Sequence, residues 1–176
     1  MRRRTLLIGS LALTTTANSL SEAAEPENLL VIELASGKVV IEMMPDLAPQ
    51  HVQRIRELAS EGFYDGVIFH RVIPGFMAQT GDPTGTGRGG SNKPNLPAEF
   101  SQESFKRGTV GMARAASPNS ANSQFFICFA AAPHLNGQYT AWGQVIEGME
   151  LVDKIAAGEP PRNPDKIIRA RVQSDM

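Results

Sequence analysis

The chain has 176 residues, of which 41% are hydrophobic and 20% charged, and its formal net charge is −1. This length predicts one domain with its own core, and the apolar fraction argues against intrinsic disorder. A net charge so close to zero gives no general attraction for nucleic acid, so we expect no nucleic-acid partner. Cys128 is the single cysteine, which excludes an internal disulfide, and we interpret it as a small buried apolar residue.

The first 23 residues have the pattern of a secretory signal peptide. Arg2 to Arg4 form a basic start, an apolar run extends from Leu6 to Leu13, and Ser21-Glu22-Ala23 provides small residues for cleavage. The run is too short to span a bilayer. We therefore expect residues 1–23 to be removed, 24–28 to be a short linker, and the protein to be exported to the periplasm without stable membrane insertion. The alternative is a cytoplasmic protein that is not processed, and the paired arginines also fit the twin-arginine export route.

Short apolar segments predict a mainly β fold. Runs at Leu29–Leu34 and Lys38–Met43 around a glycine turn predict a hairpin. A helix is expected to start at Asp46 to Pro49 and to end at Gly62, with a solvated side formed by His51, Arg54 and Glu57. Further strands are expected over residues 67–72, 76–79, 109–113, 124–129, 141–145 and 167–172, and a second helix over 149–157. Because strands and helices do not alternate, an antiparallel barrel or sandwich is favoured over a parallel sheet, with Trp142 in its core.

Two motifs that could indicate cofactor or metal chemistry fail on their context. The segment Gly85 to Gly90 matches G-x-G-x-x-G, but Pro94 and Pro97 prevent the helix that a dinucleotide site requires, so a flexible loop is the better interpretation. The three histidines and Cys128 lack zinc-ligand spacing, and His70 is interpreted as a core histidine bonded to backbone. No nucleophile elbow or P-loop is present, and we expect no cofactor and no metal.

Five sequence blocks resemble the cyclophilin family, in that family's order and at nearly its spacing. They are FHRVIPGFMAQTGD from Phe69, GTG from Gly85, MARA from Met112, SQFFIC from Ser123 and HLNG from His134. The resemblance runs from about Leu29 to Val172 and implies one domain over residues 29–176. It implies a closed, eight-stranded antiparallel β-barrel capped by two α-helices, and a peptidyl-prolyl cis-trans isomerase that uses no covalent intermediate. The interior of such a barrel is packed, so the substrate groove is expected on an outer face.

Arg71 is the residue on which we base the chemistry. It stands among apolar residues, and no acidic residue follows it until Asp82, although a desolvated charge normally needs a partner. Taken alone, it could be an exposed arginine whose stem covers apolar neighbours. Rotation about an X-Pro bond restores the lone pair of the prolyl nitrogen, and an always-charged guanidinium with several fixed N–H donors would favour that twisted state. The resemblance assigns the family's catalytic arginine to Arg71.

The resemblance also assigns the groove around Arg71. Gln79 would place Arg71 and touch the substrate backbone. The proline hollow would be lined by Phe76, Met77, Phe126 and Leu135. For Phe76, Met77 and Phe126 the alternative is packing in the core. The floor of the neighbouring groove would be formed by Ala113, Arg114 and Gln124, and a second pocket for the residues before proline would be bordered by Gly85 and Ala115. We expect proline-containing polypeptides as substrates and a monomeric enzyme.

Three positions depart from the family pattern. His134 stands where much of the family has Trp, Tyr139 where many members have His, and Ser117 looks like one extra residue after Arg114. Tyr139 keeps an aromatic wall and a hydroxyl group, so we expect activity to survive. His134 lacks the indole N–H that cyclosporin uses in the family, so weak cyclosporin binding is expected. The competing hypothesis is a binding module or holdase chaperone that grips proline-containing loops through the same groove.

Overall fold

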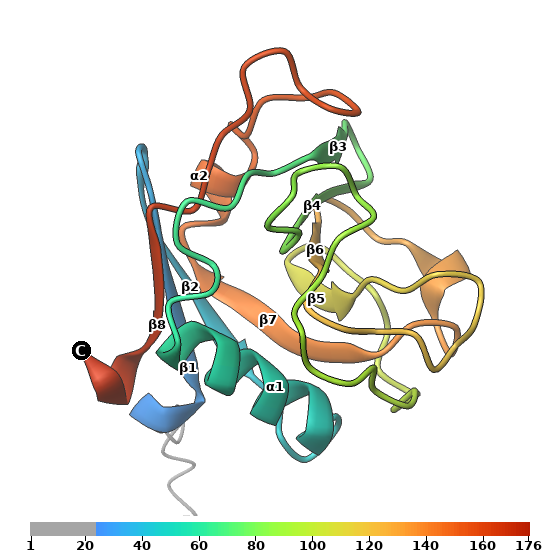
Figure 1. Ribbon diagram of the computed structural model, residues 1–176. Helices are drawn as coiled ribbons and strands as arrows, with labels where there is room; N and C mark the ends of the chain where they lie inside the picture. The colour runs from blue at the N-terminus through green and yellow to red at the C-terminus, as the bar shows by residue number, and fades with distance from the viewer. Residues whose placement is uncertain (1–23) are drawn as a thin grey trace, which may run out of the picture.

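The computed structural model describes residues 24–176, and Figure 1 shows their arrangement. The expected signal peptide, residues 1–23, lies outside the described residues, so its removal stays a prediction. The described part begins with the short turn η1 (Pro26–Asn28) and closes with η3 (Gln173–Asp175). These two turns contact each other, so the ends of the described chain lie side by side.

Eight antiparallel strands form one sheet in the order β3-β4-β6-β5-β7-β2-β1-β8. Their bounds are β1 Leu29–Leu34, β2 Gly37–Met43, β3 Arg71–Ile73, β4 Met77–Thr80, β5 Thr109–Met112, β6 Phe125–Cys128, β7 Ala141–Glu147 and β8 Arg169–Val172. In Figure 1, β1, β2 and β8 lie on one side, β3 to β6 on the other, and β7 runs between them. The expected number and direction of the strands are confirmed.

The sheet curls without closing completely, so the expectation of a closed barrel was overstated. β3 and β8 are the two ends of the strand order and share no ladder. Contact across the gap is made by the isolated bridges Ile68↔Lys166 and Val72↔Gly158 and by a bond from the Gly66 N–H to the Ile167 carbonyl at 2.7 Å. Pro160, Pro161 and Pro164 lie in the segment between these bridges, and residues without an N–H cannot donate to a ladder. The fold is therefore a curled half-barrel whose seam is held by isolated backbone bonds instead of a continuous ladder.

α1 (Pro49–Ser60) lies at the lower end of the curled sheet in Figure 1. It buries Val52, Ile55, Leu58 and Ala59 as its spacing predicts. The expectation of a solvated opposite side was wrong for His51 and Arg54, which are both buried. The Arg54 guanidinium donates to the carbonyls of Asn122 at 3.2 Å and Pro94 at 2.8 Å, and these bonds from distant loops compensate the buried charge.

α2 (Met149–Val152) is shorter than the helix expected over residues 149–157. Beyond Val152 the N–H groups of Lys154 and Ile155 bond to carbonyls only three residues back. The N–H of Ala156 then donates to a carboxylate oxygen of Asp165 at 2.8 Å. Because these bonds replace the i to i−4 pattern, the α-helix ends after about one turn.

The apolar side chains form two clusters, on opposite faces of the strands β3, β4, β6 and β5. Inside the curl, the fully buried Trp142 packs edge-on against Phe125, as expected for a core tryptophan. Successive residues of a strand point to opposite faces. Ala78 and Ile127 therefore join the inner core, whereas Met77 and Phe126 join a second cluster on the outer face. This outer cluster is where a groove was expected.

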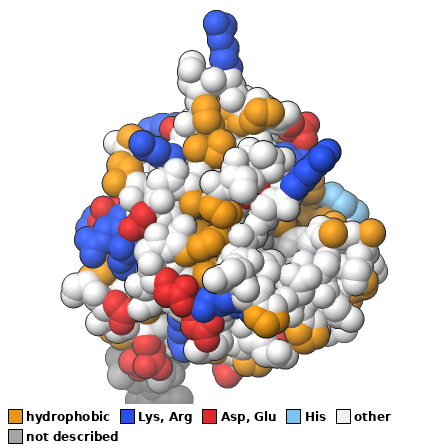
Figure 2. Space-filling view, viewed as in Figure 1, with side chains coloured by type: hydrophobic (Ala, Val, Ile, Leu, Met, Phe, Trp, Pro, Cys, Tyr) orange, Lys and Arg blue, Asp and Glu red, His pale blue; other side chains and the backbone are white. Residues whose placement is uncertain are grey.

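The surface carries both signs of charge. Figure 2 shows basic, acidic and hydrophobic side chains interspersed over the face seen in Figure 1. No helix within residues 24–176 is both long enough and apolar enough to cross a bilayer.

Candidate active site

The strand register brings the predicted site residues onto one face. Arg71 lies opposite Gln79 across β3 and β4, and Gln79 lies opposite Phe126 across β4 and β6. Met77, two residues from Gln79, points to the same side. On β5, Gly111 lies opposite Phe126, and a Cβ atom at Gly111 would stand 2.6 Å from the Phe126 ring. Glycine at this position therefore leaves the space that the ring occupies.

A groove of about 870 Å³ opens over this face. Its lining residues are His70, Arg71, Phe76, Met77, Gln79, Gly85, Thr86, Gly87, Ala113, Arg114, Phe126, His134, Leu135, Tyr139, Glu159 and Pro160. All residues predicted for the site lie here except Ala115 and Gln124, which line an adjoining pocket. The structure thus brings the predicted residues together, while the role of each remains a prediction.

The apolar part of the groove is also part of the outer cluster. Met77, Phe126 and Leu135 are almost completely buried, at 2%, 5% and 5% exposure. The Phe126 ring meets Tyr139 edge-on, with ring centroids 5.8 Å apart. At the rim, the rings of Phe76 and His134 lie 5.3 Å apart. Core packing and groove lining were alternatives for Met77 and Phe126, and these residues do both.

Arg71 has an acidic partner that the local sequence does not reveal. Its Nε donates to Oε1 of Glu159 at 2.7 Å, and its Nη1 donates to Oε1 of Gln79 at 3.4 Å. The side chain remains 43% exposed. The third nitrogen, Nη2, has no hydrogen-bond partner among residues 24–176. The guanidinium is therefore held along two edges and keeps N–H donors free.

A chain of amide bonds continues from Arg71 along the groove. Nε2 of Gln79 donates to Oε1 of Gln124 at 2.9 Å. Nε2 of Gln124 in turn donates to the carbonyls of Gly87 at 3.1 Å and Gly89 at 2.8 Å. Gln124 thus ties the strands under Arg71 to the glycine-rich loop.

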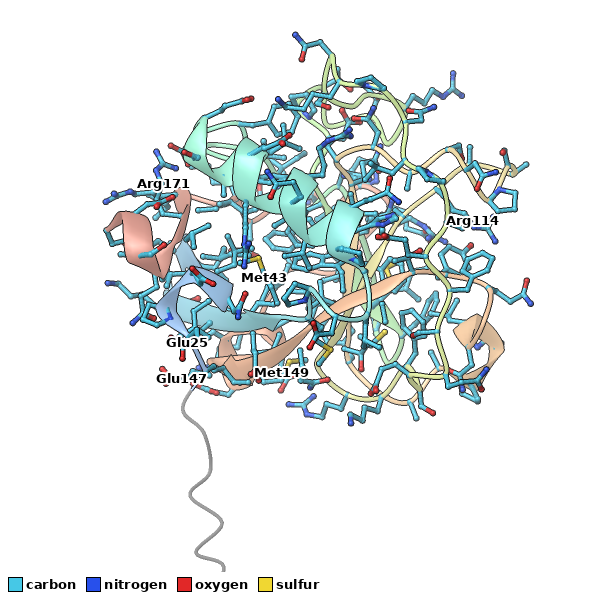
Figure 3. The ribbon with its side chains drawn as sticks, turned by 90° about the horizontal axis from the view of Figure 1, so that it is seen from below. Glu25, Met43, Arg114, Glu147, Met149 and Arg171 are labelled. Atoms are coloured by element: carbon cyan, nitrogen blue, oxygen red, sulfur yellow. The ribbon has the colours of Figure 1, made fainter. Side chains whose placement is uncertain are left out.

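An adjoining pocket of about 550 Å³ is lined by Ala113, Arg114 and Gln124, the three residues predicted for the neighbouring groove, and also by Ala115. Ala115 and Gly85 were expected to border one second pocket, but Gly85 lines the main groove and Ala115 the adjoining pocket. The Arg114 guanidinium donates to the Gln138 carbonyl at 2.8 Å and stands 4.4 Å from the centre of the Tyr139 ring. Figure 3 shows Arg114 on the side of the molecule opposite Arg171 of β8.

The glycine-rich segment is a loop, as interpreted, and it is organised around the buried Asp82. Oδ2 of Asp82 accepts the N–H groups of Gly87 at 2.6 Å and Gly89 at 3.1 Å, and Oδ1 accepts that of Thr84 at 2.8 Å. Burial alone would raise the pKa of Asp82, but the bonds from the Thr84 hydroxyl and these N–H groups outweigh it and lower the pKa to about 2. No helix follows Gly90, so the geometry of a dinucleotide site is absent at this loop.

Cys128 and His70 were also weighed in the sequence for thiol or metal chemistry. Burial raises the pKa of the Cys128 thiol to about 12, which fits the interpretation of a small buried residue. His70 is buried as expected, but no backbone group within residues 24–176 bonds to its ring, so that part of the expectation was wrong. In the same part of the chain, no group of three His, Cys, Asp or Glu side chains could hold a metal ion.

Residues 29–172 match the family model described as cyclophilin type peptidyl-prolyl cis-trans isomerase. The chain belongs to this family. This cyclophilin is 54% identical over 180 residues to a probable peptidyl-prolyl cis-trans isomerase of Brucella suis, covering 93% of this chain and 92% of the relative. It is 41% identical over 150 residues to the isomerase ppi1 of Schizosaccharomyces pombe, covering 79% of this chain and 95% of that one.

Solved structures agree with the fold of this cyclophilin. The cyclophilin AquaCyp293 from Hirschia baltica superposes with a TM-score of 0.81 at 30% identity, over 87% of this chain and 76% of that chain. A Cryptosporidium parvum cyclophilin, crystallised in the presence of the dipeptide Ala-Pro, superposes with a TM-score of 0.77 at 30% identity, over 82% of this chain and 98% of that one.

Sequence reasoning missed five residues that line the main groove: His70, Thr86, Gly87, Glu159 and Pro160. The first three lie inside or beside motifs that were already noted, so their neighbours could have indicated them. Glu159 and Pro160 lie in a proline-rich connection far along the chain. No local pattern links that connection to Arg71, and only the curled sheet brings the two together.

Proposed function

We propose that this peptidyl-prolyl cis-trans isomerase uses Arg71 as its catalytic group and the groove around it as the site for proline-containing polypeptides. The observation that carries the proposal is a guanidinium with free N–H donors beside an apolar hollow formed by Met77, Phe126 and Leu135. The Cryptosporidium parvum relative crystallised in the presence of Ala-Pro supports a proline-containing ligand.

The energetic demand on such a site is modest. Rotation about the peptide bond has a barrier of about 18–20 kcal/mol. Uncatalysed exchange of an X-Pro bond takes roughly 10–100 s. Reaching milliseconds needs about four to five decades in rate, or on the order of 6 kcal/mol. A preorganised set of donors in a partly desolvated groove can supply this amount without forming a covalent bond.

The groove offers a separate element for each part of the reaction. The hollow can hold the prolyl ring, and buried walls let it do so without rearrangement. As the bond twists, the prolyl nitrogen becomes pyramidal and accepts a hydrogen bond more strongly than in either planar isomer, so a donor from Arg71 stabilises the twisted state selectively. The backbone groups of Arg114 have no backbone partner within residues 24–176 and can pair with an extended substrate.

Replacing Arg71 tests the mechanism directly. We expect Arg71→Ala to lower kcat/KM by about 100-fold, because one preorganised donor is removed from the twisted state. A proline-peptide isomerisation assay measures this loss. The matched control is Arg169→Ala, which removes an exposed arginine from the opposite edge of the sheet and should leave the rate unchanged. Equal rates for wild type and Arg71→Ala would remove Arg71 from the mechanism.

Under the holdase hypothesis the protein binds its clients through the same groove, but the cell needs the binding and not the turnover. If turnover is the cellular function, Arg71→Ala should fail to rescue a deletion phenotype. Rescue by Arg71→Ala would favour binding over catalysis.

We further propose that the enzyme acts as a periplasmic monomer on exported polypeptides. The basic and apolar pattern of residues 1–23 supports export. N-terminal sequencing of protein from the cell envelope should find a start near Ala24, and light scattering should give the mass of one chain. A start at Met1 in the cytosol would refute export.

A further inference from the structure

Glu159 makes the shortest hydrogen bond to Arg71, at 2.7 Å, and it also lines the main groove. The two side chains are 43% and 55% exposed. An ion pair as exposed as this contributes little to folding stability, because water screens it and ordering both side chains costs entropy. Folding stability therefore does not explain this contact, and we consider instead what it does in the groove.

The position of Glu159 is fixed by the backbone beside Arg71. The N–H of Val72 donates to the Gly158 carbonyl at 2.8 Å, and the N–H of Gly158 donates back to Val72 at 2.9 Å. Gly158 has a φ of +146°, and a Cβ atom there would stand 2.6 Å from the Cα of Pro161. Only glycine fits this turn without displacing backbone. Glu159 follows Gly158 in the sequence, and Arg71 precedes Val72. The pairing of Gly158 with Val72 therefore places Glu159 beside Arg71.

The two contacts to the guanidinium differ in strength. The bond to Gln79 is long, at 3.4 Å, and its acceptor is neutral. The bond to Glu159 is short and joins two charged groups, which makes it the stronger constraint. An arginine held at Nε loses its rotamer freedom before the substrate arrives, and its remaining N–H groups stay available.

We propose that Glu159 is a positioning residue for Arg71. It holds the guanidinium at Nε so that the remaining N–H donors meet the prolyl nitrogen as the X-Pro bond twists. This inference rests on the proposed role of Arg71. Because Glu159 acts through a group that works in the twisted state, its loss should lower kcat and leave KM nearly unchanged.

Kinetics on a proline peptide test the proposal with two variants and a control. Glu159→Ala should lower kcat about tenfold, since small misplacements of a reacting group have effects of this order. Glu159→Gln keeps an acceptor and should lose less, about threefold. KM should stay within about twofold in both variants. The control, Glu150→Gln, removes an exposed charge outside the groove and should match wild type.

A second readout reports on the arginine itself. The side-chain Hε–Nε resonance of Arg71 in the NMR spectrum should shift in both Glu159 variants and stay in place in Glu150→Gln. In an Arg71→Lys background, which has no Nε–H donor, Glu159→Ala should cause no further loss of kcat.

The outcomes separate this inference from the proposed function. Loss of activity in Arg71→Ala together with wild-type kcat in Glu159→Ala would overturn the positioning role alone. Wild-type activity in Arg71→Ala would overturn both. A faster Glu159→Ala enzyme would show that the carboxylate weakens Arg71 instead of positioning it. An increase confined to KM would assign Glu159 to substrate binding and would also overturn the inference.

Discussion

His134 is the residue at the rim of the hollow where we expect one side chain to change ligand choice without affecting the catalytic group. Its ring is exposed and lies 5.3 Å from that of Phe76, so it borders the groove without filling it. An imidazole covers less apolar surface than an indole and places its N–H groups elsewhere. Inhibitor affinity is therefore expected to respond to this position more than turnover does.

We expect cyclosporin to inhibit the wild-type enzyme weakly and His134→Trp to bind it at least about tenfold more tightly, because the indole adds contact area and a donor. Inhibition of isomerase activity measures both. His134→Phe is the control that adds area without the N–H group and should recover only part of the gain. Nanomolar inhibition of the wild type would show that His134 does not occupy the expected position.

At the scale of elements, α1 depends on a residue almost fifty positions away. Its own N-cap, Ala48, offers no side-chain acceptor. The carboxylate of Glu99 accepts the N–H groups of Gln50 and His51, both at 3.1 Å. It also bonds to Nδ1 of the buried His51 at 2.6 Å. Burial, helped by the nearby charge of Arg54, lowers the pKa of His51 although Glu99 acts to raise it. Because a carboxylate can only accept, Nδ1 of His51 is the donor in this contact.

Glu99→Gln should lower the free energy of unfolding by about 1–2 kcal/mol, because one carboxylate oxygen that accepts N–H groups becomes an NH₂ donor. Urea denaturation measures the change. Glu150→Gln, an exposed loss of the same charge, should cost almost nothing. Equal stability of the two variants would show that Glu99 does not cap α1.

The sequence predicts elements better than it predicts their polar partners. The β1–β2 hairpin and the inward residues of α1 followed from apolar spacing and a glycine turn, which are local signals. The burial of His51 and Arg54 could not follow in this way, because Glu99, Pro94 and Asn122 lie on other segments. For the same reason, the sequence did not predict that Glu159 is the partner of Arg71. Arg71, Gln79 and Phe126 could be predicted to lie together because the family resemblance implies a three-dimensional arrangement. Residue spacing alone does not give that arrangement.

At the scale of the whole molecule, the seam of the sheet was the least predictable feature. The strand count follows from the apolar segments and the family resemblance, but closure depends on whether the two edge strands can exchange hydrogen bonds. The prolines between Gly158 and Lys166 cannot donate to a ladder, and the exchange is confined to isolated backbone bonds. This open seam is also the place from which Glu159 reaches the groove.

The stability of the whole protein should fall in acid, in part through Asp82. Its pKa is lowered from 3.8 in an unfolded chain to about 2 in the folded protein. A lowered pKa stabilises the folded state above the unfolded value, so this contribution, about 2 kcal/mol, is lost as the pH falls from about 4 to 2. Urea denaturation at several pH values measures the loss.

Asp82→Asn should remove this part of the acid dependence and lower stability at pH 7 by about 2–4 kcal/mol, because an NH₂ group would face the N–H groups of Gly87 and Gly89. The exposed Asp175→Asn serves as the control and should keep the wild-type profile. An unchanged acid profile in Asp82→Asn would contradict the assignment.

The floor of the hollow has a consequence for how this enzyme can diversify. Met77, Phe126 and Leu135 are as tightly enclosed as core residues, so exchanging any of them disturbs packing as well as ligand contact. New preferences can therefore arise with least penalty at the mouth of the groove, where exposed residues such as His134 lie on connections between strands. Related enzymes should therefore have similar residues on the floor of the groove and different residues at its mouth.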